Sequence, residues 1–261
     1  MKKAGLIVYS FLLWTFFIIS SIILLLLGFL IWLVTRWFDK RLTVLHLWSC
    51  FWASWYIWFN PLWRVRITGR RKIPWRRPCI LVSNHQSMLD ILVLYHLFVP
   101  YKWVSKKENF NLPIIGWNMR LNRYLEIERG KKESAVKLMD DSAALIRQGN
   151  SILMFPEGTR YPGGSLGTFK EGAFKMALDN HADIIPILLD GTARALPKKG
   201  VILTGFANIK VRVLDPIPYT SFAGKPVREL LNDVRELMSV EYTWLYSNRN
   251  PETDTSNNPV R

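Results

Sequence analysis

The sequence is organised around one stretch, which reads Asn84-His85-Gln86-Ser87-Met88-Leu89-Asp90. An apolar run at residues 79–83 precedes it and is typical of a buried strand, and a second apolar run at 91–94 follows it and is typical of a helix. Open α/β sheets carry their chemistry in such segments, just beyond the ends of strands. The stretch therefore predicts a strand-turn-helix unit of an α/β fold, with a candidate site at the turn.

The spacing of His85 and Asp90 decides whether their side chains can meet. On a continuous helix, a separation of five residues would place them about 140° apart. Residues 87–90 instead match the S-x-x-D capping box, with Ser87 as N-cap and Asp90 in the first turn. The imidazole of His85 can then fold back onto the carboxylate, and an oriented imidazole is suited to general-base catalysis. The alternative is that Asp90 is only a capping partner and His85 only a turn residue.

The charge and length of the chain narrow the class of protein. Its 261 residues allow one domain of roughly 200 residues plus an attachment. The net charge of +15 implies an anionic partner, either a nucleic acid or an anionic membrane surface. The aromatic residues gather in apolar segments rather than among the basic residues, so we expect no nucleic-acid partner. The spacing of Cys50 and Cys79 suggests neither a metal site nor a disulfide framework.

The first 63 residues predict a membrane anchor. Residues 4–34 carry no charge and exceed the roughly 20 residues that span a bilayer, which predicts an uncleaved transmembrane helix, tilted, or else a hairpin. Residues 42–63 are rich in Trp and predict an interfacial segment, with a core helix as the alternative. The basic residues that follow position 34 favour the cytoplasmic side for the rest of the chain.

Predicted strands and helices alternate between residues 64 and 246. This alternation predicts an α/β sandwich with a largely parallel sheet flanked by helices. Pro186 lies inside the predicted strand 184–189 and indicates an edge strand or a bulge. Residues 112–117 predict either a short helix lining a hydrophobic groove or plain core. The polar segment 247–261 predicts a disordered tail.

A second string of polar residues follows another predicted strand, at residues 152–155. It reads Phe155-Pro156-Glu157-Gly158-Thr159-Arg160. Because it also ends a strand, it should reach the same sheet edge as His85. The guanidinium of Arg160 is always charged and can bind a phosphate with two hydrogen bonds. The alternative is a strand-to-loop turn with a surface ion pair.

Taken in order, these blocks make residues 65–215 resemble the glycerophospholipid acyltransferase family. The resemblance rests on Asn84-His85 to Asp90, Ile127-Glu128-Arg129, Phe155 to Arg160, Ile185-Pro186-Ile187 and the basic residue Lys106. It implies an acyltransferase domain at residues 64–246, after an anchor at 1–63. The order and length of the matching blocks make a chance match improbable.

The resemblance also implies roles for single residues. His85 and Asp90 would be the catalytic pair. Six residues would bind the substrate: Glu157, Gly158, Thr159 and Arg160 would hold the glycerol phosphate, and Arg129 and Lys106 would add positive charge. The acceptor would be lysophosphatidic acid, the donor acyl-CoA or acyl-acyl carrier protein, and the product phosphatidic acid. Neither a metal nor another cofactor is expected. Anionic membrane lipids would be partners, and the location would be a bacterial inner membrane.

Other functions stay open from the sequence alone. Residues 163–167 match G-x-S-x-G, which would suit a lipase-like hydrolase with Ser165 as nucleophile. However, no predicted strand directly precedes this motif, and only His181 follows it as a base. A non-catalytic membrane scaffold is a further alternative. Within the family, the acceptor could instead be glycerol 3-phosphate or a lyso-amino-lipid.

Overall fold

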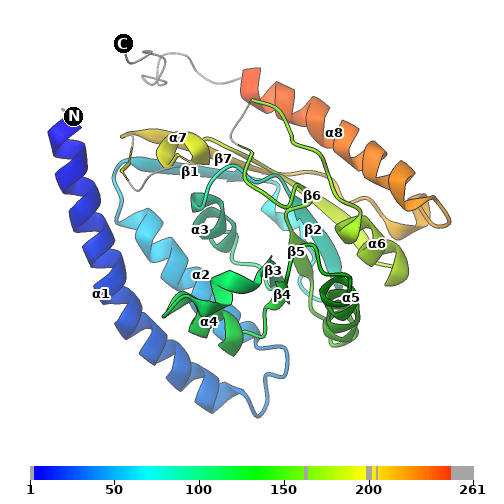
Figure 1. The fold of residues 1–261 in the computed structure, drawn as a ribbon, viewed down its shortest axis with the longest axis horizontal. Coiled ribbons are helices and arrows are strands. Elements are labelled where there is room, and N and C mark those ends of the chain that lie inside the picture. Colours follow the sequence, from blue (N-terminus) through cyan, green and yellow to red (C-terminus); the bar gives the residue numbers. More distant parts are fainter. Residues whose placement is uncertain (1–2, 162–163, 198–201, 204, 248–261) are drawn as a thin grey trace.

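In the computed structural model, the chain forms one open sheet with helices on both faces (Figure 1). The structure describes residues 3–161, 164–197, 202–203 and 205–247. The tail at 247–261 that the sequence predicts to be disordered lies outside these residues, except for Ser247.

The sheet of the described residues contains seven strands. They are β1 (Trp63–Thr68), β2 (Cys79–Ser83), β3 (Lys102–Lys106), β4 (Leu125–Ile127), β5 (Ile152–Met154), β6 (Asp183–Asp190) and β7 (Ala207–Val213). Their order across the sheet is β1-β7-β6-β2-β5-β3-β4. The strands from β6 to β4 run parallel, β7 is antiparallel to β6, and β1 is parallel to β7. The predicted α/β fold with a largely parallel sheet is therefore confirmed.

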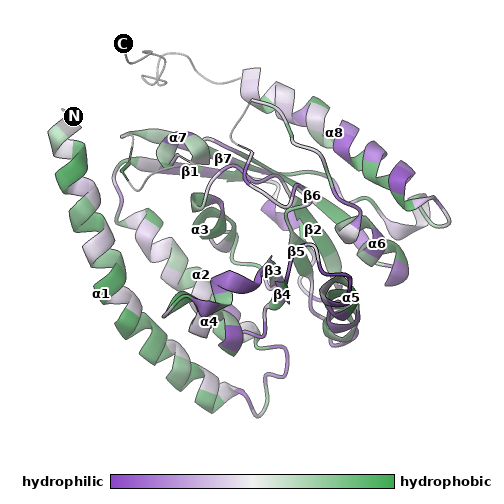
Figure 2. Cartoon of the chain, in the orientation of Figure 1, coloured by the Kyte–Doolittle hydropathy of each residue, from purple (hydrophilic) through white to green (hydrophobic). Residues whose placement is uncertain are grey.

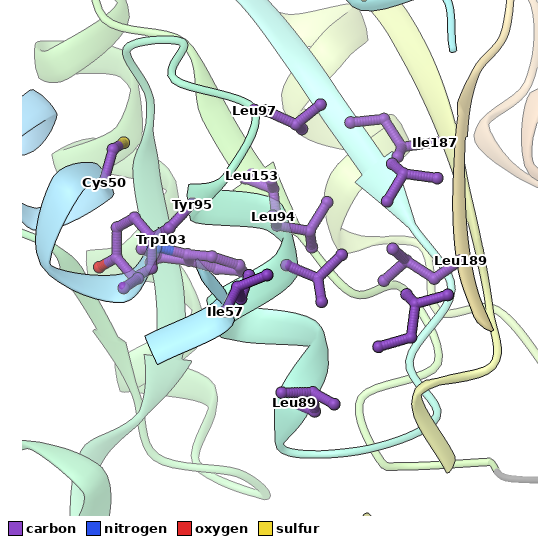
Figure 3. Packing of buried hydrophobic residues seen from close by; sticks show 14 of the residues in the cluster. Cys50, Ile57, Leu89, Leu94, Tyr95, Leu97, Trp103, Leu153, Ile187 and Leu189 are labelled. Atoms are coloured by element: carbon purple, nitrogen blue, oxygen red, sulfur yellow. The ribbon is translucent and has the colours of Figure 1, made fainter. Parts of the chain in front are cut away.

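The helices form two layers, one on each face of the sheet. They are α1 (Lys3–Thr35), α2 (Thr43–Trp58), α3 (Leu89–Tyr95), α4 (Ile115–Leu121), α5 (Lys132–Arg147), α6 (Gly172–Asp179), α7 (Thr192–Ala195) and α8 (Val227–Ser247), with short 3₁₀ turns at Arg70–Lys72, Lys107–Asn111 and Tyr219–Ser221. One core cluster joins the sheet to α1, α2, α3, α4 and α7, and the other joins it to α5, α6 and α8. Figure 3 shows part of the first cluster.

Strand β2 sits between these layers and contributes to both cores. Cys79 and Leu81 belong to the first cluster, whereas Ile80 and Val82 belong to the second. Successive side chains of a strand point to opposite faces, so a strand covered on both faces is apolar throughout. All five residues of β2 are buried. The turn that carries His85 is therefore attached to the most enclosed strand of the sheet.

Pro186 lies in a central strand, so the prediction of an edge strand is wrong, whereas the alternative of a bulge fits the pairing beside it. Pro186 faces Leu214 but Ile184 pairs with Ile217, which leaves one extra residue on the partner segment. β6 pairs with β2 on one side and with β7 on the other. The carbonyl of Pro186 accepts a hydrogen bond from the backbone N–H of Leu214 at 2.9 Å, just beyond the end of β7. The nitrogen of Pro186 faces that same side, beside the irregular step in the pairing, which resumes at Ile184 and Ile217. No bond to β2 is lost, which explains why proline is tolerated here.

The apolar N-terminus forms one continuous helix rather than a hairpin. α1 has 33 residues, which corresponds to a length of about 50 Å. Figure 2 shows that most of its residues are hydrophobic. Many of these side chains are exposed, and α1 is the one described helix long and apolar enough to cross a membrane. α1 thus indicates membrane association.

Polar contacts fasten α1 to α2 along its length. The hydroxyl of Tyr9 donates to Asn60 Oδ1 at 3.0 Å. Ser21 Oγ lies 2.7 Å from the hydroxyl of Tyr56, and Trp48 Nε1 donates to the carbonyl of Leu24 at 2.9 Å. α2 is itself largely buried against α1 and α3. It therefore has the packing of a core helix, the alternative to the interfacial segment expected for residues 42–63.

Candidate functional site

The parallel strands bring the sequence-predicted site residues to one edge of the sheet, the edge formed by the carboxyl ends of the strands. His85 follows β2, Glu157 and Arg160 follow β5, Lys106 ends β3, and Arg129 follows β4. β2, β5, β3 and β4 are consecutive neighbours. Because adjacent strands lie about 4.8 Å apart, this row spans roughly 14 Å. The edge thus carries a His–Asp pair at one end and basic residues along the rest.

The His85 and Asp90 side chains are in direct contact. His85 Nδ1 lies 2.8 Å from Asp90 Oδ2. α3 begins at Leu89 with Met88, not the predicted Ser87, as its N-cap. One half of the predicted capping box is present, because Ser87 N–H donates to Asp90 Oδ2 at 2.9 Å. In place of the other half, Ser87 Oγ accepts from Leu89 N–H at 3.3 Å, and Asp90 N–H donates to the carbonyl of Ser87 at 3.2 Å. The backbone N–H of Gln86 also donates to Asp90 Oδ2, at 2.6 Å. The turn therefore fixes a fully buried carboxylate against the imidazole.

These contacts define the chemistry of the imidazole. A carboxylate only accepts hydrogen bonds, so Nδ1 carries the proton and Nε2 keeps a free lone pair. The ring of His85 stacks on Phe155 with centroids 4.0 Å apart and an interplanar angle of 14°. Its side chain remains 16% exposed. His85 thus has the orientation and the exposure that a general base requires.

Further contacts hold the turn in place, and the sequence analysis did not find them. The Asn84 side chain exchanges two hydrogen bonds with the backbone of Leu189 in β6, at 2.7 and 2.9 Å. The Gln86 amide donates to the Tyr242 hydroxyl at 2.6 Å and accepts from Thr192 Oγ1 at 3.3 Å. These contacts join residues more than 100 positions apart. The sequence signal was limited to polar residues next to an apolar strand.

Glu157 faces the back of the catalytic turn instead of open solvent. Its side chain is buried, and Oε1 accepts a hydrogen bond from the backbone N–H of His85 at 3.2 Å. Burial raises the pKa of the Glu157 carboxyl to about 7, and the backbone N–H of His85 opposes this rise. Gly158 follows with φ +65°, a conformation that favours glycine. Glu157 is therefore hydrogen-bonded to the backbone of His85, and the substrate-binding role expected from the sequence stays a prediction.

The raised pKa predicts a pH-dependent stability for Glu157→Gln. The carboxyl is protonated in the fold but ionised in the unfolded chain between pH 4.5 and about 7, so its contribution to stability falls as pH rises through this window. The side-chain amide of Glu157→Gln does not ionise, so its contribution to stability does not fall with pH. Its oxygen can still accept a hydrogen bond from His85 N–H. We expect the stability of Glu157→Gln relative to wild type to increase by up to about 3 kcal/mol from pH 4.5 to 8. Thermal unfolding of both proteins at several pH values measures this. A stability difference between variant and wild type that did not change with pH would contradict the raised pKa of the buried carboxyl.

Arg160 remains available for an anion. Within the described residues it forms no ion pair, so the alternative of a surface ion pair does not describe this turn. The backbone N–H of Tyr161 donates to the carbonyl of His85 at 2.7 Å, which ties the Arg160 segment to the catalytic turn. Thr159 is exposed beside Arg160. The backbone of this segment is thus tied to the turn that carries His85, and the Arg160 side chain forms no ion pair among the described residues.

The two other predicted cations lie farther along the edge. Arg129 is exposed after β4. Lys106 Nζ lies 2.8 Å from Glu108 Oε1, and both side chains are well exposed. Exposed ion pairs of this kind contribute little stability, so an anion can compete for Lys106. The edge therefore offers positive charge at graded distances from His85.

The remaining histidines and the G-x-S-x-G motif do not form a second site. His46 hydrogen-bonds Tyr124 and the carbonyl of Val99, and His96 hydrogen-bonds Ser54. Ser165 is exposed, and β5, the preceding strand in the described residues, already ends at Met154. A nucleophile elbow requires a strand directly before the serine. Among the described residues, no group of three or more His, Cys, Asp or Glu is placed to hold a metal ion.

Comparison with known proteins finds similarity to acyltransferases. A family model described as Acyltransferase matches residues 64–190. The chain is 35% identical over 196 residues to a chloroplastic 1-acyl-sn-glycerol-3-phosphate acyltransferase of Brassica napus, covering 75% of this chain and 56% of that protein. It is 40% identical over 153 residues to a 1-acyl-sn-glycerol-3-phosphate acyltransferase of Chlamydomonas reinhardtii, covering 58% and 44%. The chain thus spans about half the length of these relatives.

A solved structure shares the fold. The crystal structure of the 1-acyl-sn-glycerophosphate acyltransferase PlsC from Thermotoga maritima matches with a TM-score of 0.74. The match covers 94% of this chain and 99% of that chain, at 19% sequence identity. At this identity the match establishes the common architecture, including the N-terminal helices and the sheet.

Proposed function

Since this chain belongs to the acyltransferase family through residues 64–190, we propose that it acylates the sn-2 hydroxyl of 1-acyl-sn-glycerol 3-phosphate. The product is phosphatidic acid, used in phospholipid synthesis, and the donor is acyl-CoA or acyl-acyl carrier protein. The observation that carries this proposal is the 2.8 Å contact between His85 and Asp90, in a turn to which the segment after Arg160 is hydrogen-bonded. The names of the similar proteins support the choice of acceptor.

The proposed reaction uses His85 as base and then as acid. Nε2 of His85 takes the proton of the acceptor hydroxyl, and the hydroxyl oxygen attacks the thioester carbonyl carbon. The tetrahedral intermediate collapses with cleavage of the C–S bond, and the imidazolium returns the proton to the leaving sulfur. The carboxylate of Asp90 stabilises the imidazolium between these two transfers. This sequence involves neither a covalent acyl-enzyme nor a metal or other cofactor.

The phosphate of the acceptor would bind the basic residues of the same edge. Arg160 precedes Tyr161, whose backbone N–H donates to the carbonyl of His85, so this segment is tied to the turn, with Gly158 and Thr159 just before it. Lys106 and Arg129 add positive charge from the two strands beyond β5. Charge-assisted hydrogen bonds to a phosphate are about twice as strong as neutral ones. This arrangement supports a phosphate-bearing acceptor over a lyso-amino-lipid.

The location of the reaction is also proposed. α1 associates the chain with a membrane, and acceptor and product are lipids, so catalysis at the bilayer surface avoids moving acyl chains into water. The basic residues Arg36, Lys40 and Arg41 after α1 favour a cytoplasmic catalytic domain at a bacterial inner membrane. Anionic membrane lipids are the partners that fit the charge of +15, and no nucleic acid is required.

One assay separates this proposal from its alternatives. Purified protein in lipid–detergent micelles is given acyl-CoA or acyl-acyl carrier protein, and thiol release is measured with and without lysophosphatidic acid. We expect release only with the lyso-lipid, and unchanged release in Ser165→Ala. Thiol release without an acceptor would indicate a hydrolase. Thiol release only with glycerol 3-phosphate or a lyso-amino-lipid would reassign the acceptor. The absence of thiol release with every acceptor would favour a non-catalytic membrane scaffold.

Arg160 should control the affinity for the phosphate of the acceptor. We expect Arg160→Ala to raise KM for lysophosphatidic acid by roughly tenfold to a hundredfold, because a hydrogen bond to a charged group contributes about 1.5–3 kcal/mol. The value of kcat should change little if the contact is equally strong in the transition state. Arg160→Lys should recover part of the lost affinity, since it keeps the positive charge but lacks the paired N–H donors of the guanidinium. Steady-state kinetics with Arg66→Ala, an exposed control, tests this; an unchanged KM would contradict it.

A further inference from the structure

A groove lies between α1 and α4, where the C-terminal half of α1 passes α4 (Figure 1). Its volume is about 510 Å³. The walls are apolar side chains of α1, among them Leu25 and Phe29, and Trp117 and Leu121 of α4. One alternative for residues 112–117 is a short helix lining a hydrophobic groove, and α4 is such a helix. Arg123 closes one end of the groove.

Arg123 also lines a second, cationic pocket. This pocket has a volume of about 260 Å³ and is lined by Arg36, Lys40, Leu42 and Gln148 in addition to Arg123. Its basic residues come from the segment that joins α1 to α2 and from the residue before Tyr124, which leads into β4. The shared Arg123 makes the two hollows neighbours. Together they present an apolar groove that leads to a cluster of positive charge.

The positive charges of this cluster are not neutralised by acidic side chains. Within the described residues, Arg36, Lys40 and Arg123 form no ion pair. The guanidinium of Arg36 instead lies over the Trp32 ring, 4.8 Å from its centroid. The nearby carboxylate of Asp39 accepts a hydrogen bond from the first turn of α2, at Val44 N–H. The cluster therefore has an excess of positive charge.

A buried lysine, Lys102, lies within the electrostatic range of Arg123. Lys102 Nζ donates to the carbonyl of Asn122 at 2.9 Å. Burial lowers the pKa of Lys102 to about 7; Asp39 opposes this shift, and the charges of Arg123 and Arg41 add to it. An anion bound at Arg123 would relieve this repulsion.

This cationic pocket lies at the edge of the sheet formed by the amino ends of the strands, whereas His85 lies at the other edge. Gln148 precedes β5 and Arg123 precedes β4, whereas the candidate catalytic residues follow the strands. Ile80 of β2 is level with Ile152 of β5, and five residues separate Ile80 from His85. At about 3.3 Å per residue, the two edges are roughly 16 Å apart. A thioester held in the pocket would not reach the base.

We propose that the groove and the cationic pocket bind one anionic phospholipid of the surrounding membrane. An acyl chain lies along Leu25 and Phe29 of α1, and the phosphate binds among Arg36, Lys40 and Arg123. The charge excess selects an anionic headgroup, and the apolar groove on a membrane-associated helix selects a lipid rather than a protein. This lipid is a bound partner and not the acceptor. The proposal rests on α1 and α4 and does not depend on the reaction.

The test is a lipid titration followed by native mass spectrometry. Purified protein in detergent receives dioleoyl phosphatidylglycerol, dioleoyl phosphatidylcholine or inorganic phosphate, with and without acyl carrier protein. The test variant carries Arg36→Gln, Lys40→Gln and Arg123→Gln. The control variant loses equal charge at exposed sites, through Arg66→Gln, Arg71→Gln and Lys132→Gln. Trp117→Ala alters the groove alone. Thermal unfolding compares the folding of each variant, and single Lys40→Gln serves if the triple variant is unfolded.

We expect one phosphatidylglycerol per chain, bound at least tenfold more weakly by the test variant and unchanged in the control variant. Trp117→Ala should also weaken it, whereas phosphatidylcholine and inorganic phosphate should not compete. Equal losses in both charge variants would overturn the proposal, as would equal binding of phosphatidylcholine. Competition by inorganic phosphate would reduce the site to a simple anion site. Loss of acyl carrier protein binding without loss of lipid would assign the surface to that protein.

Discussion

Replacing His85 with alanine should lower the rate of acyl transfer by about a hundred- to ten-thousand-fold. General-base catalysis contributes this much, and the contacts of Nδ1 and Phe155 leave Nε2 as the base. The loss should appear mainly in kcat, because the imidazole acts on the proton of the hydroxyl and not on the phosphate. The fold should persist, since His85 Nδ1 is one of several donors to Asp90 and the backbone contacts of the turn remain.

The matched control for this variant is His181→Asn. His181 is exposed, lies outside the candidate site, and has φ +50°, a conformation that asparagine tolerates. Thiol release and phosphatidic acid formation should be normal in this control. If His85→Ala kept more than a tenth of the wild-type kcat while remaining folded, another group would have to be the base. If His85→Ala lost its activity because it no longer folded, variants at the neighbouring positions of the turn would show whether His85 is the base.

Asp90→Asn should also lower kcat by more than about a hundredfold, with little change in KM. The amide oxygen can occupy the place of Oδ2 and accept from Gln86 N–H and Ser87 N–H. The amide nitrogen then takes the place of Oδ1, which has no hydrogen-bond partner among the described residues. The variant keeps the shape of the turn but removes the negative charge that stabilises the imidazolium. A buried unpaired donor should cost about 1–3 kcal/mol of stability.

Two measurements separate the electrostatic role of Asp90 from its structural role. Chemical denaturation gives the stability change, and steady-state kinetics gives kcat and KM for the lyso-lipid. Ser87→Ala is the control, because it removes the Ser87 Oγ cap on Leu89 but leaves the carboxylate in place. A folded Asp90→Asn enzyme with near-normal kcat would show that Asp90 only caps α3. That outcome is the structural alternative already visible in the sequence.

The part of the site that the sequence predicts is the part set by local geometry. The S-x-x-D pattern places Asp90 within one helical turn of Ser87, so the approach of His85 follows from backbone chemistry alone. The alternation of apolar segments likewise predicts parallel strands, and parallel strands bring Arg160 to the edge that carries His85.

The part that the sequence does not predict depends on distant contacts. Glu157 is followed by Gly158 and looks like a turn residue, yet the packing of β5 against β2 directs its carboxyl toward His85 N–H. The supports from Tyr242 and Thr192 come from segments whose pairing no local pattern encodes. The central position of Pro186 was missed for a related reason: proline is tolerated there because of the irregular pairing with the segment that follows β7. Residue type alone therefore indicates the chemistry, and tertiary structure decides which way a side chain points.

The fastening of α1 to α2 has a consequence for how the lipid acceptor is found. Tyr9, Ser21 and Leu24 hold the helix to the domain at successive levels, so the domain and its anchor move as one body. The catalytic edge then keeps a constant depth relative to the lipids that surround α1. An acceptor embedded in the same leaflet approaches by lateral diffusion, a search in two dimensions rather than three. Turnover at low occupancy should accordingly follow the mole fraction of acceptor in the bilayer and be insensitive to the total volume of the solution.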